Sequence, residues 1–161
     1  MKITIHWQMP IQLTRNKKII IDQKKPPEDI ENRPGVYFFS RKFGQSLIPF
    51  YIGETLSIRG RLKSHLASAQ IADVLRGFSS DKEIKNGARY FHYGYLKGNA
   101  DKPLTKKRLS IAQRHLIRAA IEDDVPILNS NLTKVRTHTL EFTGGWRARA
   151  IYEKMATVEA T

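Results

Sequence analysis

The sequence of 161 residues contains no cysteine, which excludes both a disulfide framework and a zinc site with cysteine ligands. It also lacks a long apolar run, because the alternating residues at its start are soon followed by Pro10. This start is typical neither of a signal peptide nor of a membrane-spanning helix. We therefore expect a soluble, cytoplasmic protein.

Acidic residues are scarce relative to basic ones: 15 Asp and Glu stand against 28 Lys and Arg, giving a formal net charge of +13. This excess makes a polyanion the leading class of partner, and nucleic acid is the commonest polyanion. An anionic membrane surface, or another charged interaction partner, is the alternative. The basic residues form neither a polybasic tail nor a basic amphipathic helix, so we expect DNA and no membrane.

The length is sufficient for one domain with a proper core and too short for two of ordinary size. Residues 3–7 alternate apolar and polar side chains, as in a half-buried strand, and residues 18–21 form a second apolar run. We expect these two runs to pair as a hairpin. Pro27 and the acids after it predict a short helical turn at 27–31.

A second hairpin is expected from the strand-forming runs 36–39 and 47–52, with a loop near 41–46. Pro49 predicts that the second of these strands lies at a sheet edge or carries a bulge. Strand alternation places Pro49 and Tyr51 on one face, and it allows Tyr37 and Tyr51 to point to the same side.

The rest of the chain predicts a helix from Ser57 to Arg76, a strand over 88–96 and a second helix from Thr105 to Asp123. A strand at 139–142 and a short helix from Trp146 to about Met155 are expected in the tail. The core order is therefore β-β-α-β-α. The fold class is α+β, a small three-stranded, mainly antiparallel sheet with flanking helices.

Several short motifs fall in a fixed order on this pattern. They are Gly35-Val36-Tyr37, Tyr51-Ile52-Gly53, Arg61, His65 one helical turn later, Leu116-Ile117 and 126–129. Together they resemble the GIY-YIG nuclease domain over residues 34–130, which leaves 1–33 as an N-terminal β extension and 131–161 as a C-terminal extension.

The resemblance implies hydrolysis of DNA phosphodiester bonds with one divalent cation, Mg²⁺ or Mn²⁺. Tyr37 would be the general base, its phenol acidified by a nearby cation or arginine, with Tyr51 as its partner. Arg61 would neutralise phosphate charge in the transition state. His65 would hydrogen-bond the attacking water or Tyr37, and Asn129 would help to fix the site.

The sequence departs from the family at Gln113, where the family has a metal-binding glutamate. Glutamine keeps an acceptor oxygen but loses the charge on which magnesium sites of this kind depend. Glu122 lies on the opposite side of the helix and cannot replace it. We expect DNA binding with slow or absent cleavage, through an introduced substitution or a natural loss of activity. A catalytically inactive nucleic-acid-binding module of the same fold is the alternative.

Basic residues near the motifs are candidates for contacts with nucleic acid, although each could equally belong to a solvated surface. The candidates are Arg41, Lys42, Arg59, Lys63, Arg89, Lys106 and Lys107. Further candidates lie in 79–89, 102–108, 134–136 and 147–149. Glu54 is expected to cap the following helix or to be solvated. The compact chain resembles a stand-alone restriction or defence nuclease, and a homodimer is possible because two cuts in a duplex need two sites.

Overall fold

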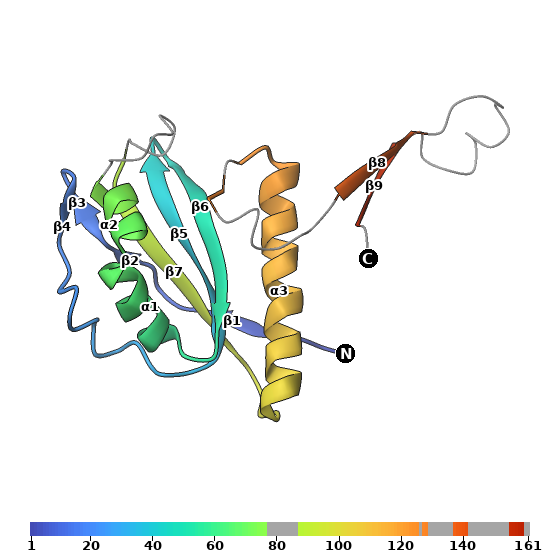
Figure 1. Ribbon diagram of the computed structural model, residues 1–161, viewed down its shortest axis with the longest axis horizontal. Coiled ribbons are helices and arrows are strands. Elements are labelled where there is room, and N and C mark those ends of the chain that lie inside the picture. The colour runs from blue at the N-terminus through green and yellow to red at the C-terminus, as the bar shows by residue number, and fades with distance from the viewer. Residues whose placement is uncertain (77–86, 126, 129–136, 142–154, 160–161) are drawn as a thin grey trace, which may run out of the picture. The chain divides into compact units, whose positions relative to one another are not determined.

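The computed structural model describes residues 1–76, 87–125, 127–128, 137–141 and 155–159 (Figure 1). The chain divides into two compact units, Met1–Asn129 and Ser130–Thr161. In the second unit β8 (Thr137–Glu141) pairs antiparallel with β9 (Met155–Glu159). The expected tail strand is thus found two residues earlier than predicted. Residues 146–154 of the expected tail helix lie outside the described residues, and Met155 begins a strand.

The first unit is built on one antiparallel sheet with the strand order β1-β7-β5-β6. These strands are β1 (Ile5–Trp7), β7 (Arg89–Leu96), β5 (Gly35–Phe43) and β6 (Ser46–Thr55), and β2 (Ile11–Gln12) also pairs with β7. The mixed α+β class with an antiparallel sheet is confirmed. The N-terminal segment enlarges the sheet beyond the three strands that the sequence predicted.

The predicted hairpin between residues 3–7 and 18–21 is wrong. β1 pairs with β7, whereas β4 (Lys18–Ile19) pairs with β3 (Thr14–Arg15). Asn16 and Lys17 connect this short hairpin with positive φ angles of 48° and 63°. Two residues with positive φ form the tight turn that joins neighbouring antiparallel strands, so β4 finds its partner next to it in sequence.

The hairpin of β5 and β6 is confirmed, with a shorter connection than predicted around Gly44, whose φ is +59°. The pairing register shifts between Phe39 and Ser40, so Phe50 is the extra residue of a bulge in the edge strand β6. The bulge also shifts the alternation of side chains. Pro49 therefore faces α3, and the prediction that it shares the face of Tyr51 is wrong.

The predicted helix over 57–76 is two helices, α1 (Ile58–Ala67) and α2 (Ala69–Arg76). Ser68 separates them because its backbone is extended, with ψ of 126°. Ser57 caps α1 by accepting a hydrogen bond from the Gly60 amide. The third helix, α3 (Lys102–Glu122), is capped by Asp101 and begins three residues before the predicted start.

Helices cover both faces of the sheet (Figure 1). Tyr37 and Phe39 pack with Leu62 and Leu66 of α1 on one face. On the other face, Ile52 packs with Ile117 of α3, which runs beside β6 (Figure 1). Val36, the neighbour of Tyr37, packs with Leu109 of α3, so the side chains of these two residues point to opposite faces of the sheet. No helix in the described ranges has the length and apolar character needed to cross a bilayer.

Candidate active site

The hydroxyl group of Tyr37 is the centre of a buried polar cluster between β5 and α1. Its Oη atom lies 2.7 Å from Nε2 of His65 and accepts a hydrogen bond of 3.1 Å from Nε of Arg61. Arg61 and His65 are four residues apart and lie on the same flank of α1, as predicted. Tyr37 itself has an exposed fraction of 0%.

Two glycines make room for this cluster. A Cβ atom on Gly53 would lie 2.2 Å from Oη of Tyr37, directly across the β5–β6 ladder. A Cβ atom on Gly35 would lie 2.2 Å from the carbonyl oxygen of Gly94 on β7. Both distances are far below van der Waals contact, so the glycines of the two tyrosine motifs are required by packing.

The guanidinium group of Arg61 links the buried cluster to the surface. Its Nε atom donates to Tyr37, while the side chain is exposed. Tyr51 is a second, weaker hydrogen-bond partner of the guanidinium group, and Arg61 forms no ion pair with the described residues. The hydrogen bond to Tyr37 raises the pKa of Arg61, so this group stays positively charged. Arg61 therefore presents a fixed planar fork to the solvent.

The expected acidic phenol is not found. Burial raises the pKa of Tyr37, and this effect exceeds the opposing effect of the Arg61 hydrogen bond. Burial also lowers the pKa of His65 from 6.5 to about 4, with a smaller contribution from the charge of Arg61. Both groups are neutral at neutral pH. Since Arg61 can only donate to Oη, the Tyr37 hydroxyl can donate its proton to Nε2 of a neutral His65.

Tyr51 completes the aromatic lining of the cluster. Its ring stacks on that of Tyr37, with centroids 6.3 Å apart, and meets the His65 ring edge-on at 5.0 Å. Tyr51 is half-buried. The structure thus brings together Tyr37, Tyr51, Arg61 and His65, four of the predicted site residues. Asn129 lies outside the described residues.

Gln113 lies on α3, on the other face of the sheet from Tyr37, and reaches the backbone of the edge strand. Its Nε2 atom donates a hydrogen bond of 3.3 Å to the carbonyl oxygen of Ile52. The described residues include no group of three or more His, Asp or Glu side chains that could hold a metal ion. A hard cation such as Mg²⁺ prefers carboxylate oxygens, and position 113 offers an amide engaged with the backbone. The described donor set does not fit a resident divalent cation.

The environment of Glu54 differs from the one expected from the sequence. It does not cap α1, because Ser57 does so, and it is half-buried rather than solvated. Burial raises the pKa of Glu54, while the positive charges of Lys106 and Arg61 oppose that increase. The position of Glu54 directly after Gly53 indicated that it lies near the site, but the sequence alone did not predict that Lys106 is close enough to affect its pKa.

The basic candidates divide into buried and exposed groups. Arg89 is 1% exposed, and its guanidinium donates to the carbonyl oxygens of Val74 and Gly87, so its predicted contact with nucleic acid is wrong for this structure. Arg59 is half-buried and donates to the loop at residues 26–30. Arg41 is 9% exposed and lies over the ring of Phe43.

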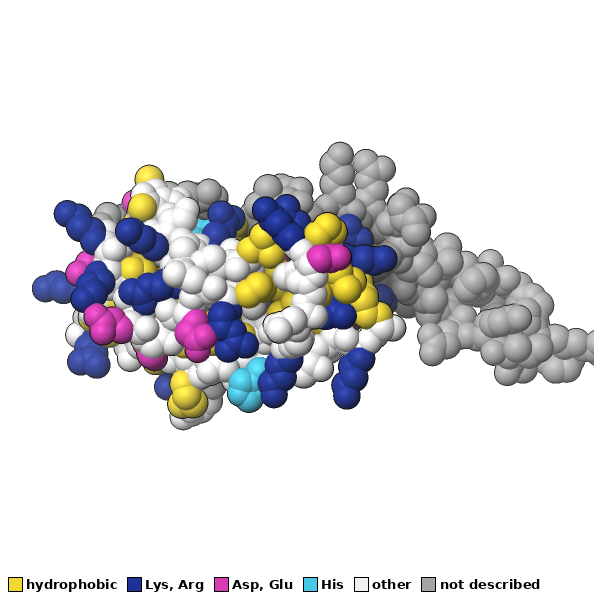
Figure 2. Space-filling model, turned by 90° about the horizontal axis from the view of Figure 1, so that it is seen from below, with side chains coloured by type: hydrophobic (Ala, Val, Ile, Leu, Met, Phe, Trp, Pro, Cys, Tyr) yellow, Lys and Arg dark blue, Asp and Glu magenta, His cyan; other side chains and the backbone are white. Residues whose placement is uncertain are grey.

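The exposed candidates are Lys42, Lys63, Lys106 and Lys107. Figure 2 shows Lys and Arg side chains across the visible face of the molecule, with few Asp and Glu side chains among them. Only three ion pairs occur among the described residues, and none involves these four lysines. The charges of these four lysines are therefore not engaged in an ion pair within the described chain.

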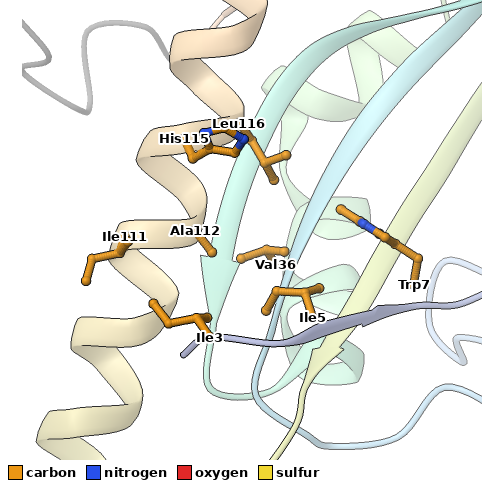
Figure 3. Close-up of a pocket in the computed structure, with 8 residues that line it drawn as sticks. All are labelled: Ile3, Ile5, Trp7, Val36, Ile111, Ala112, His115 and Leu116. Carbon is orange, nitrogen blue, oxygen red and sulfur yellow. The ribbon is translucent and has the colours of Figure 1, made fainter. Parts of the chain in front are cut away.

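A groove of about 430 Å³ lies between the N-terminal strand and α3, on the opposite face of the sheet from Tyr37 (Figure 3). Figure 3 shows Ile5, Val36 and Ala112 facing one another across it, with Trp7 and His115 toward its ends. The lining is apolar apart from His115, so it lacks the convergent polar groups of a reaction centre.

Comparison of the chain with known protein families, with curated proteins and with solved structures finds no match.

Proposed function

We propose that this chain binds a DNA phosphodiester at Arg61, in a site of the GIY-YIG nuclease type whose cleavage step is held back by Gln113. The observation that carries the proposal is the hydrogen bond from Nε of Arg61 to Oη of Tyr37. This contact uses the inner nitrogen of the guanidinium group, so the outer N–H groups that Tyr51 does not engage can donate to a ligand. The resemblance of the ordered motifs supplies the reaction class.

The shape and charge of the exposed fork match a phosphate group. Two parallel N–H groups can donate to two phosphate oxygens, and such bidentate, charge-assisted contacts are among the strongest that arginine makes. The net charge of +13 favours the approach of a polyanion from any direction. DNA is the favoured substrate because of this charge and the resemblance together.

The neutral state of Tyr37 and His65 suits the binding of an anion. A phenolate next to Arg61 would repel the phosphate, whereas a neutral hydroxyl orients the guanidinium without adding negative charge. The proton of Tyr37 lies on a short path to Nε2 of His65, 2.7 Å away. The pair can therefore relay a proton once a substrate has changed the environment of the cluster.

Gln113 accounts for the expected lack of cleavage. It brings no negative charge to the site, and its amide nitrogen is engaged with Ile52. By the resemblance, a glutamate at this position would supply the missing carboxylate, and it could not donate to the carbonyl group of Ile52. The same hydrogen bond favours the second candidate function, a binding module in which Gln113 has become a structural residue that joins α3 to β6.

The test is nicking of supercoiled plasmid with Mg²⁺ by the parent chain and by Gln113→Glu. The nuclease proposal expects little or no nicking by the parent and a gain of about a hundredfold or more in the variant, the size typical of a lost or restored catalytic group. Gln113→Leu serves as a control, because it also removes the hydrogen bond to Ile52 without adding charge. If Gln113→Glu binds DNA but remains inert, the binding module is the better description.

A further inference from the structure

Glu54 is the only acidic side chain on the elements that form the Tyr37 cluster. β5, β6, β7 and α1 contain no other Asp or Glu. A lone carboxylate beside a site for an anion is unfavourable for binding, so its position requires an explanation.

The fold places Glu54 at the edge of the sheet, between the two helix layers. Gly53, the preceding residue, lies against Oη of Tyr37. On the other side, Gln113 fixes α3 to the carbonyl group of Ile52, two residues before Glu54. Lys106 precedes Gln113 by seven residues, which is two helical turns on the same flank of α3. Glu54 is accordingly subject to the positive charges of both Arg61 and Lys106.

We propose that one strand of the bound nucleic acid passes from Arg61 over the Glu54 end of β6 to Lys106, and that Glu54 between them limits its affinity. This inference rests on the proposed function and names the path that the nucleic acid takes away from the site. In the unbound chain Glu54 partly neutralises the two cations. A phosphate backbone that reaches both of them must compete with this carboxylate.

The surface of α3 is suited to continue this path. Lys102, Lys106, Lys107 and Arg114 are exposed, and none of them forms an ion pair with another described residue. Lys107 and Arg114 are seven residues apart, which is two helical turns and about 10 Å along one flank of α3. One strand of a duplex carries a phosphate about every 3.4 Å of axis, so this flank spans about three nucleotides.

The test is equilibrium binding of a DNA duplex at several salt concentrations by Lys106→Gln, Glu54→Gln and the double variant. Lys106→Gln is expected to weaken binding about two- to fivefold and to reduce the slope of log affinity against log salt by about one. Glu54→Gln is expected to strengthen binding by a similar factor. Lys18→Gln is the matched control, since this exposed lysine lies on β4, away from α3 (Figure 1).

The inference is overturned if Lys106→Gln behaves like Lys18→Gln, or if Glu54→Gln binds no more tightly than the parent. The Lys106 comparison decides on its own if Glu54→Gln does not fold, because Lys106 is exposed. The proposed function has a separate signature. If Arg61→Gln loses affinity while Lys106→Gln does not, only the path is wrong, whereas absence of salt-dependent binding by the parent contradicts the proposed function itself.

Discussion

The space left by the absent side chain of Gly53 is occupied by the hydroxyl group of Tyr37, because a Cβ atom on Gly53 would lie 2.2 Å from Oη. The side chain of Tyr37 cannot easily move away, because its ring packs against the rings of Phe39, Phe91 and Tyr51. The position of the phenol that orients Arg61 thus depends on a glycine in the neighbouring strand.

Gly53→Ala is therefore expected to displace Tyr37 and to weaken DNA binding, with a loss of about 1–3 kcal/mol in the free energy of unfolding from overpacking. Urea denaturation and DNA-binding titrations measure the two effects. Gly44→Ala is the control: its φ of +59° makes alanine strained, but nothing lies within 4 Å of the added Cβ. It should lose stability and keep full affinity. Unchanged affinity in Gly53→Ala would contradict the proposed role of Tyr37.

Tyr37→Phe removes the oxygen that binds both Arg61 and His65 while keeping the ring. It is expected to reduce DNA affinity less than Arg61→Gln does, because the guanidinium loses its orientation but not its charge. The free energy of unfolding should fall by about 1–3 kcal/mol, because His65 is buried and its Nε2 atom loses the hydrogen bond to Tyr37. Tyr93→Phe is the matched control on β7, where a 4% exposed tyrosine packs on the same side of the sheet. Equal DNA affinities of the two variants would rule out an orienting role.

Stability is expected to fall in mild acid. The folded-state pKa of His65, about 4, is lower than its ordinary value of 6.5, so the unfolded chain takes up a proton first as pH falls. The stabilisation is complete above pH 6.5 and is lost between 6.5 and 4, with about 1–2 kcal/mol gone at pH 5. His92 acts in the same direction, because burial lowers its pKa to about 4 as well.

Urea unfolding at pH 7 and pH 5 measures this loss, and His65→Gln isolates the share of one residue. The variant should be less stable than the parent at pH 7 and should show a weaker pH dependence. An unfolding free energy of the parent that stays constant or rises from pH 7 to pH 5 would show that His65 is not held neutral by the fold.

Strand alternation allowed Tyr37 and Tyr51 to share a side, and a four-residue helical spacing placed Arg61 and His65 on one flank, whereas the resemblance of the motifs implied that the two pairs form one site. Pro49 predicted that β6 lies at a sheet edge or carries a bulge, and the structure has both, but the sequence did not identify Phe50 as the extra residue. The burial of Arg89 could not be predicted from the sequence either. It follows from a long-range pairing, in which Arg89 of β7 lies opposite Arg41 of β5 and under α2.

The break at Ser68 and the environment of Glu54 were also not predicted from the sequence. Ser68 interrupts a run whose apolar residues continue at helical spacing, so periodicity alone favours one helix. The environment of Glu54 depends on how α3 packs against β6, through the contact of Gln113 with Ile52. Such contacts between distant segments determine which charged residues face a ligand, and a single sequence does not record them.

The central claim is that Arg61, oriented by Tyr37, binds a phosphate group of DNA. Its most direct test is duplex binding by the parent, Arg61→Gln and Arg15→Gln over a range of salt concentrations, where Arg15 is an exposed arginine on β3. We predict a steep salt dependence for the parent and about tenfold weaker binding with a slope smaller by about one for Arg61→Gln. Arg15→Gln should match the parent. Equal affinities and slopes for the two variants would contradict the account.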